Sequence, residues 1–277
     1  PLVPRHLRFG VKERIRADGR VEVPLDRTSL DAAIARLKAE DVTSVAVCYL
    51  HAYRDPRHER ETLEVLEKAM PGVSVSLSSD VLPQIKEYER VSTTVVNAYV
   101  APLIALYLGR LEERLVGAGF DGPLMIILSQ GGVAQVAEAV LVAAATVRSG
   151  PAGGLAGGRR VAEILDAPNL ITFDVGGTSS DIALIAGGEP TLSKDRTMAG
   201  ERIALPSLDI VTLGAGGGSL ARVEASGLLE VGPESAGSVP GPICYGRGGT
   251  RPTVTDASVV LGYLDPENFA EIGRAHV

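Results

Sequence analysis

The stretch NLITFDVGGTSSDIALIAGG, from Asn169 to Gly188, decides how the rest of this chain is interpreted. Its first part is rich in apolar and β-branched residues up to Asp174, and its last part is apolar again after Asp181. Two runs of this kind predict β-strands, and the glycine and hydroxyl residues between them predict a turn. We therefore expect a β-hairpin whose polar residues gather at its tip.

The tip of this hairpin has the composition of a phosphate site. Gly176 and Gly177 lack a Cβ, which permits positive φ and lets successive backbone N–H groups approach a bulky anion. The hydroxyl groups of residues 178–180 add donors, and the carboxylates of Asp174 and Asp181 suit a hydrated divalent cation or a positioned water. The pattern is neither a Walker A loop nor GxGxxG. The plain alternative is a glycine turn that connects two core strands.

Length and composition restrict the class of protein. The chain has 277 residues, 45% of them hydrophobic, which is enough for one large domain or two smaller ones. A net charge of −7 without a basic cluster argues against nucleic acid and an anionic membrane surface as partners. Cys48 and Cys244 match no metal or redox spacing, which favours free thiols in the cytoplasm. The apolar run from Val136 to Val147 is too short to span a bilayer.

Strand-like and helix-like segments alternate before the hairpin. Thr28 or Ser29 is expected to cap a first helix, and the buried strand VTSVAVCYL follows from Val42. A second helix is expected after Asp55, and the strand VSVSLSS from Val73. Alternating β and α units predict an α/β layer architecture.

The segment that leads to the hairpin is mainly helical. A long helix is expected from about Lys86 to Val116, bent near Pro102, because proline removes a backbone donor. A strand at residues 124–130 and a short helical run precede another helix that begins near Pro151. The small residues of that last helix allow close approach of another backbone, either for packing or as a hinge.

Polar features after the hairpin lie among glycines, and each has two interpretations. The run Gly214-Ala215-Gly216-Gly217-Gly218-Ser219 can admit the adenosine or phosphates of a ligand against backbone, or can be a flexible turn. Arg247 can face phosphate or a partner carboxylate, or lie in solvent. Asp256 can be a carboxylate of a cleft or the cap of a following helix.

Four motifs in register, SGPAGG, FDVGGTSSD, LGAGGGS and CYGRGGTRPTVTDA, strongly resemble the A subunit of the hydantoinase/oxoprolinase family. The similarity also includes CYLHAYRDPRHE and LPQIKEYERVSTTVVNAYV, and so runs over nearly the whole chain. The resemblance implies the α/β nucleotide-binding fold shared by actin, sugar kinases and Hsp70-like chaperones (the ASKHA fold), with ATP between two lobes. It implies that residues 1–150 belong to the first lobe with connecting helices, and residues 151–270 to the second lobe.

Both ends are interpreted as truncated. The chain starts at Pro1 without an initiator Met, and the family's first phosphate hairpin, DxGGTxTD, is absent from it. Residues 271–277, EIGRAHV, are interpreted as a non-native tail and excluded from fold reasoning. Because only the second of two phosphate hairpins is present, we expect these residues alone to bind Mg²⁺-ATP weakly or not at all.

The resemblance assigns roles to residues at the hairpin and in the loops. Asp174 would hold Mg²⁺ or its waters, Asp181 would orient water or the metal, and Asp256 is a weaker catalytic candidate. The residues that would bind the nucleotide are Gly176, Gly177, Thr178, Ser179, Gly214, Gly216, Gly217 and Gly218.

The resemblance also implies an activity. The chain would be part of an ATP-dependent cyclic amidohydrolase that opens hydantoin-type or 5-oxoproline-type rings together with a B-type subunit. An amide carbonyl is a poor electrophile, and phosphoryl transfer to its oxygen creates a leaving group. The alternatives are a ketone carboxylase subunit for acetone or acetophenone, and a non-catalytic nucleotide-binding module.

Overall fold

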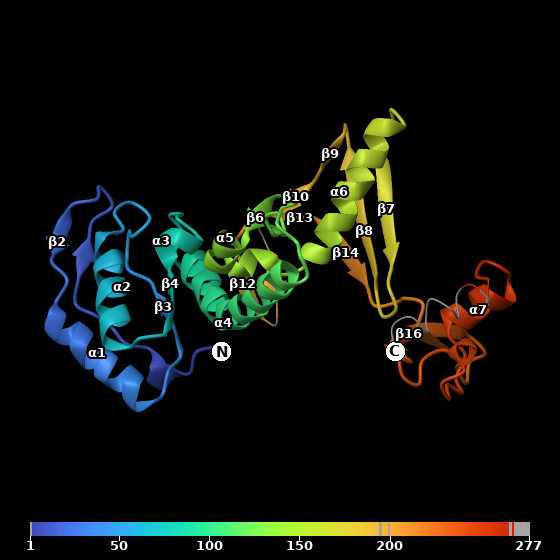
Figure 1. Ribbon diagram of the computed structural model, residues 1–277, viewed down its shortest axis with the longest axis horizontal. Helices are drawn as coiled ribbons and strands as arrows, with labels where there is room; N and C mark the ends of the chain where they lie inside the picture. Colours follow the sequence, from blue (N-terminus) through green and yellow to red (C-terminus); the bar gives the residue numbers. More distant parts are fainter. Residues whose placement is uncertain (1, 194–195, 199, 266–267, 269–277) are drawn as a thin grey trace. The chain divides into compact units, whose positions relative to one another are not determined.

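The computed structural model describes residues 2–193, 196–198, 200–265 and 268, so the tail proposed for residues 271–277 lies outside the described part. The protein is of the mixed α/β class and divides into two compact units. Unit 1 comprises Pro1–Gly153 and Leu192–Leu208, and unit 2 comprises Gly154–Thr191 and Asp209–Val277. Figure 1 shows the elements of each unit along the chain.

Unit 1 contains the alternating β and α segments that the sequence predicts. Its elements are η1 (Arg5–Leu7), β1 (Arg14–Ile15), β2 (Val21–Val23), α1 (Arg27–Ala39), β3 (Ser44–Val47), α2 (Arg57–Ala69), β4 (Ser74–Leu77), α3 (Ser78–Val81), α4 (Glu87–Gly117), β5 (Met125–Ile127), β6 (Val133–Gln135), α5 (Val136–Leu141), η2 (Ala143–Thr146), β10 (Leu192–Ser193), β11 (Arg196–Met198), β12 (Glu201–Ile203) and β13 (Ser207–Leu208). Helix α6 (Ser149–Ile164) starts in unit 1 and continues into unit 2.

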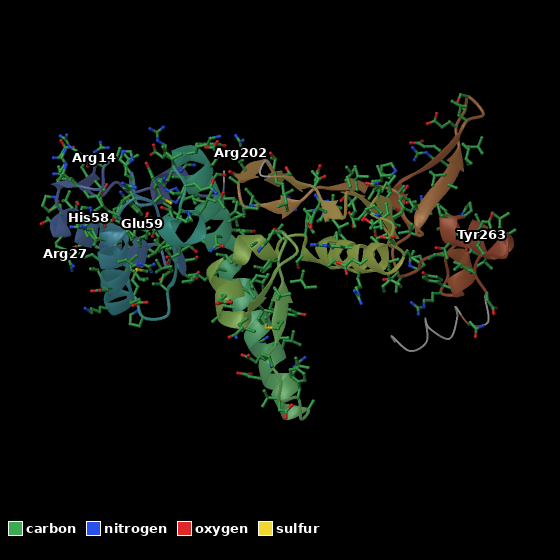
Figure 2. All side chains as sticks on the ribbon, turned by 90° about the horizontal axis from the view of Figure 1, so that it is seen from above. Arg14, Arg27, His58, Glu59, Arg202 and Tyr263 are labelled. Atoms are coloured by element: carbon green, nitrogen blue, oxygen red, sulfur yellow. The ribbon has the colours of Figure 1, made fainter. Side chains whose placement is uncertain are left out.

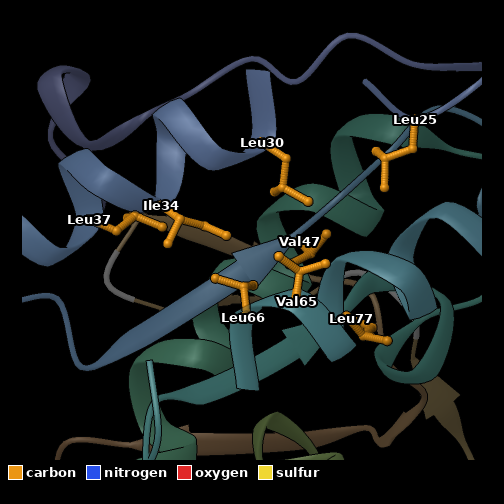
Figure 3. Close-up of a cluster of buried hydrophobic side chains, with 8 residues drawn as sticks. All are labelled: Leu25, Leu30, Ile34, Leu37, Val47, Val65, Leu66 and Leu77. Carbon is orange, nitrogen blue, oxygen red and sulfur yellow. The ribbon is translucent and has the colours of Figure 1, made fainter. Parts of the chain in front are cut away.

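The first part of unit 1 is a three-layer sandwich around the parallel pair β3–β4. One face of the pair meets α1 and α2 through a cluster of buried side chains that Figure 3 shows. The other face meets α4, where Ser44 Oγ donates to Ala98 O at 2.6 Å and the Asn97 amide donates to Ser76 Oγ at 3.0 Å. The alternation of apolar and small polar residues along both strands explains why the two faces differ. The buried cluster consists of Leu25, Leu30, Ile34, Leu37, Val47, Val65, Leu66 and Leu77.

The first helix begins earlier than the sequence analysis expects. Asp26 is its N-cap and accepts from Ser29 N at 3.1 Å, so Thr28 and Ser29 are already helical and the expected caps are wrong. The strand expected through residue 79 ends at Leu77, because Ser78 and Ser79 turn into α3 and bind a buried carboxylate. Both differences arise from side-chain bonds to the backbone.

Helix α4 is long and apolar enough to cross a membrane by length and composition, a property that the sequence analysis did not consider for this segment. Of that apolar window, 44% is buried within the protein. Its first half carries buried polar residues that bond to neighbours in unit 1: Ser92 Oγ donates to Arg202 O at 2.7 Å, and Ala204 N donates to Thr93 Oγ1 at 3.0 Å. Satisfied buried polar groups of this kind are typical of a core helix.

Unit 2 is built on an antiparallel sheet in the order β14-β8-β7, with β9 paired to β8. Helix α6 packs on one face of β7, whereas large apolar side chains of the opposite face, such as Phe173 and Val211, are exposed. The remaining elements form a second antiparallel pair and a short helix. The elements of unit 2 after α6 are β7 (Leu170–Val175), β8 (Ser180–Ala186), β9 (Glu189–Pro190), β14 (Ile210–Leu213), β15 (Ser219–Val223), β16 (Leu229–Ser235), η3 (Ile243–Tyr245) and α7 (Val254–Val260).

Candidate functional site

The predicted hairpin is present, and its tip is a four-residue loop. Strands β7 and β8 pair in register up to Val175 and Ser180, and Gly176 N donates to Ser179 O at 2.9 Å to close the loop. Residues 176–178 are exposed. The strands therefore deliver the glycine and hydroxyl residues to the surface of unit 2, as the alternation of the sequence predicts.

The backbone N–H groups of the tip are available to a ligand. Among the described residues, the N–H groups of Gly177, Thr178 and Ser179 make no hydrogen bond within the protein. Two carbonyls of this turn are occupied instead: Gly217 N donates to Gly176 O at 2.9 Å, and Gly218 N donates to Gly177 O at 2.7 Å. A turn with paired carbonyls and unpaired N–H groups presents donors to an anion.

The glycines of the tip do not supply the positive φ that the sequence analysis expects of them. Neither Gly176 nor Gly177 has a φ in the left-handed region, so positive φ is not their role. A Cβ on Gly176 would lie 3.0 Å from Ser179 O, whereas a Cβ on Gly177 would meet nothing within 4 Å. Gly176 is therefore required by the close turn, and Gly177 leaves its N–H group uncovered.

The second glycine run is a buried support for this tip. A Cβ on Gly216 would lie 2.5 Å from Gly176 O, and a Cβ on Gly218 would lie 2.8 Å from Gly177 O. The amide of Gly216 is used by Ser219 Oγ at 2.8 Å, and those of Gly217 and Gly218 are used by the hairpin. The loop is thus no flexible turn. Its glycines permit the close backbone approach that the sequence suggests, and the backbone that packs against them is the tip of the β7–β8 hairpin.

Helix α6 fixes the strand that carries the first carboxylate. A Cβ on Gly158 would lie 2.4 Å from Thr172 Cγ2, and a Cβ on Gly154 would lie 3.7 Å from Asp174 Oδ2. These two glycines are one helical turn apart and share a face. Gly154, the last residue of SGPAGG, and Gly158 beyond it thus serve helix–strand packing beside Asp174, which is one of the two roles expected for the small residues of this helix.

The two carboxylates of the hairpin occupy facing positions. Asp174 and Asp181 are direct cross-strand partners, and Thr212 Oγ1 donates to Asp181 Oδ1 at 2.5 Å. Mg²⁺ in nucleotide sites is held by one or two carboxylates together with phosphate oxygens and water, so this donor set fits the ion. Among the described residues, no group of three or more His, Cys, Asp and Glu side chains forms a metal cluster, which a protein-only metal cage would need.

Asp256 lies at the start of α7, where it completes a capping box with Thr253. Its carboxylate accepts from Cys244 N, Thr253 N and Thr253 Oγ1, each at 2.8 Å. Burial acts to raise the pKa of Asp256, but these hydrogen bonds outweigh it and hold the pKa below its usual range. The geometry matches the helix cap considered for this residue, and its catalytic role stays a prediction.

A network of buried charges in unit 1 was missed by the sequence analysis. The Glu59 carboxylate, fully buried, accepts from Tyr49 N at 3.0 Å, Ser78 Oγ at 2.6 Å and Ser79 N at 2.9 Å. Arg90, 1% exposed, donates to Ser78 Oγ at 3.2 Å and to Tyr49 O at 2.9 Å. The available signal was an arginine that precedes a long uncharged run, since such a charge is buried only when it is paired.

The fold and the site define a mixed α/β protein that presents a glycine hairpin with unpaired N–H groups and two facing carboxylates. Residues 90–276 match the hydantoinase/oxoprolinase family, and residues 1–70 match its N-terminal region. The chain belongs to the hydantoinase/oxoprolinase family, as the motifs predict.

The relatives of this chain are named for different activities. Caprolactamase subunit alpha of Pseudomonas jessenii is 43% identical over 95% of this chain, and acetone carboxylase beta subunit of Xanthobacter autotrophicus is 35% identical over 97%. The chain spans 38% of the length of each. The crystal structure of ATP-dependent caprolactamase from Pseudomonas jessenii matches 95% of this chain, and 38% of its own, with a TM-score of 0.77. A nucleotide-free acetone carboxylase structure matches 97% of this chain, and 38% of its own, with a TM-score of 0.76 at 34% identity.

Proposed function

We propose that this chain is the phosphate-binding part of an ATP-dependent enzyme subunit with an ASKHA-type fold, which opens cyclic amides of the hydantoin or 5-oxoproline type. The observation that carries the proposal is the hairpin tip, where the N–H groups of Gly177, Thr178 and Ser179 are unpaired among the described residues. The carbonyls of Gly176 and Gly177, by contrast, accept from backbone N–H groups of the second glycine run. Such a tip offers donors to phosphate oxygens and has little affinity for a cation at its backbone.

The residues of the hairpin would contribute positioning and charge. Backbone N–H groups of Gly177 and Thr178 would bind the terminal phosphates, and the carboxylates of Asp174 and Asp181 would hold Mg²⁺, which neutralises phosphate charge. The γ-phosphoryl group would pass to the amide carbonyl oxygen, and water would add to the activated carbon. Cleavage of the C–N bond, with the proton of the added water passing to the departing nitrogen, would leave an acyl phosphate, ADP having departed in the first transfer. A second water would then displace phosphate from the acyl carbon to give the open-chain acid. A B-type partner subunit is part of this proposal, since relatives are named as subunits.

The test uses the full-length polypeptide with its partner subunit. Asp174→Ala is expected to abolish ATP hydrolysis that depends on a hydantoin or lactam, while the circular dichroism spectrum is unchanged. Asp209→Ala serves as the matched control, because Asp209 is an exposed aspartate elsewhere in unit 2. Unchanged coupled turnover in Asp174→Ala contradicts the site.

Ketone carboxylation is a second candidate on the same scaffold. Acetophenone carboxylase gamma subunit of Aromatoleum aromaticum is 37% identical over 97% of this chain, which is close to the values for hydrolases. Both reactions need an activated carbonyl oxygen, so the hairpin would serve either. ATP consumption that depends on bicarbonate together with acetone or acetophenone, and not on a cyclic amide, favours the carboxylase.

A further inference from the structure

A cluster of charged side chains in unit 1 lines a cavity, apart in the sequence from the β7–β8 hairpin. A cavity of about 520 Å³ opens where the β1–β2 hairpin meets the loop after β3, a size within the range of small-molecule sites. Arg14 and Arg16 line it from the hairpin, and His51 lines it from the loop. Figure 2 shows Arg14 in this N-terminal part of the chain, together with His58 and Glu59.

The hairpin wall is anchored by a buried hydrogen bond between a carboxylate and an imidazole, directly beside Arg14. Glu13 Oε2 and His58 Nδ1 are 2.8 Å apart, and their side chains are only 6% and 5% exposed. The pair joins the start of β1 to α2, because Glu13 precedes Arg14 and His58 lies in the first turn of that helix. Two groups removed from water in this way hold a fixed geometry, so the backbone that carries Arg14 is well positioned.

The loop wall holds its residue in an unfavourable conformation. His51 has φ of 59°, in the left-handed region that a non-glycine residue seldom adopts. The turn is enforced by Arg54 N and Asp55 N, which donate to His51 O at 2.8 and 3.3 Å. The buried charges described above hold Tyr49, two residues before His51, since Glu59 accepts from Tyr49 N and Arg90 donates to Tyr49 O. Strained residues that the surroundings over-determine cluster at functional sites.

The two arginines that line the cavity differ in their contacts. Arg16 pairs with Glu22, and Asp18 pairs with Arg20 at 2.7 Å. The hydrogen bond from Arg16 lowers the pKa of Glu22, and the bond from the Arg20 backbone lowers that of Asp18, so both acids are ionised at neutral pH. Arg14 adds to the electrostatic stabilisation of Glu22, but among the described residues its side chain makes no ion pair or hydrogen bond, so its guanidinium donors are open to a ligand.

We propose that this cavity binds the carboxylate group of a small organic molecule, with the Arg14 guanidinium as its principal contact and the His51 imidazole as the second. A planar guanidinium matches a carboxylate with two parallel N–H···O bonds. The proposal rests only on unit 1 and does not depend on the proposed function of the hairpin.

The first test is an NMR titration of the whole chain, labelled with ¹⁵N at arginine and histidine. Sodium propionate is the probe, sodium chloride at equal ionic strength is the reference, and sodium phosphate is a second arm. Propionate should shift the Arg14 Nε–H and His51 ring signals saturably, and chloride should not. Arg14→Gln should weaken the propionate affinity at least tenfold. Arg27→Gln, an exposed arginine of α1 outside the cavity, should not change it.

The second test separates binding from folding at the strained residue. Glycine adopts a φ of 59° without cost, so His51→Gly should keep or raise the unfolding temperature while propionate affinity falls. Wild-type signals that move equally with chloride, retained affinity in Arg14→Gln, or tighter binding of phosphate than of propionate would each overturn the carboxylate assignment.

Discussion

Asp174 and Asp181 face each other as direct cross-strand partners in the β7–β8 hairpin. Like charges at directly opposite positions of an antiparallel pair are destabilising. The hydroxyl of Thr212 donates a hydrogen bond to Asp181 Oδ1. The hairpin therefore carries a repulsion that a bound cation would relieve, and this repulsion can be measured.

Asp174→Asn should raise the stability of the chain when no divalent cation is present. Removal of one of two facing charges is expected to increase the free energy of unfolding by about 0.2–1 kcal/mol. Urea denaturation in EDTA measures it, and Asp209→Asn, an exposed change in the same unit, should stay within about 0.5 kcal/mol of the parent. A destabilised Asp174→Asn chain would show that the carboxylate has a structural role instead.

Neighbouring glycines of α6 should respond in opposite directions to alanine. Gly158→Ala places a Cβ 2.4 Å from Thr172 Cγ2, a methyl on a stiff β-branched side chain, and should cost about 1–3 kcal/mol. Gly157→Ala meets nothing within 4 Å and should stabilise the helix by about 0.5–1 kcal/mol. Thermal unfolding of both variants provides the comparison, and equal effects would refute the packing of α6 on β7.

Glu59→Gln should be strongly destabilising, in contrast to Glu64→Gln on the same helix. The Glu59 carboxylate accepts three hydrogen bonds while fully buried. Its replacement leaves these buried donors without a negatively charged acceptor, and it removes the negative charge to which Arg90 is linked through Ser78. We expect a cost of about 3 kcal/mol. Glu64 is exposed, so its replacement should change the free energy of unfolding by less than about 0.5 kcal/mol. Chemical denaturation of the two variants tests the difference.

Asp256 should contribute stability that is lost in acid. Its pKa is lower in the folded protein than in an unfolded chain, so the contribution is present above the unfolded pKa of about 3.9 and disappears as the pH falls through the folded value. Asp256→Ala should cost about 1–2 kcal/mol at pH 7. The gap between parent and variant should narrow from about pH 5 to pH 2 in urea denaturation. A gap that is independent of pH would mean that the carboxylate's charge is not involved.

Local patterns in the sequence predicted the hairpin and the long helix because both are determined by nearby residues. The apolar runs that flank Asp174 and Asp181 were sufficient to predict the hairpin, which the structure confirms. Errors occurred where a side chain reaches the backbone of another segment. Ser78 was predicted to be in a strand, but its hydroxyl bonds Glu59, nineteen positions earlier, and α3 begins there.

The candidate site was only partly predictable for the same reason. Composition alone indicated that the glycines 214–218 permit close approach, but the partner of that approach is a set of carbonyls on the hairpin. From the sequence, Asp256 could be either a carboxylate of a cleft or the cap of a helix. Only its hydrogen bonds to Cys244 and Thr253 in the structure reveal the cap. The cavity beside Arg14 needs residues from two segments, so no single stretch of sequence signals it.

The support of the hairpin tip by a distant loop has a consequence for synthesis on the ribosome. Ser180 Oγ donates to Ala215 O at a separation of 35 residues. The carbonyls of Gly176 and Gly177 accept from the amides of Gly217 and Gly218, which lie still farther along the chain. Translation at roughly 5–20 residues per second places these partners about 2–8 s apart. The strands can pair as soon as they emerge, whereas the turn at residues 176–179 acquires its final shape only after this delay.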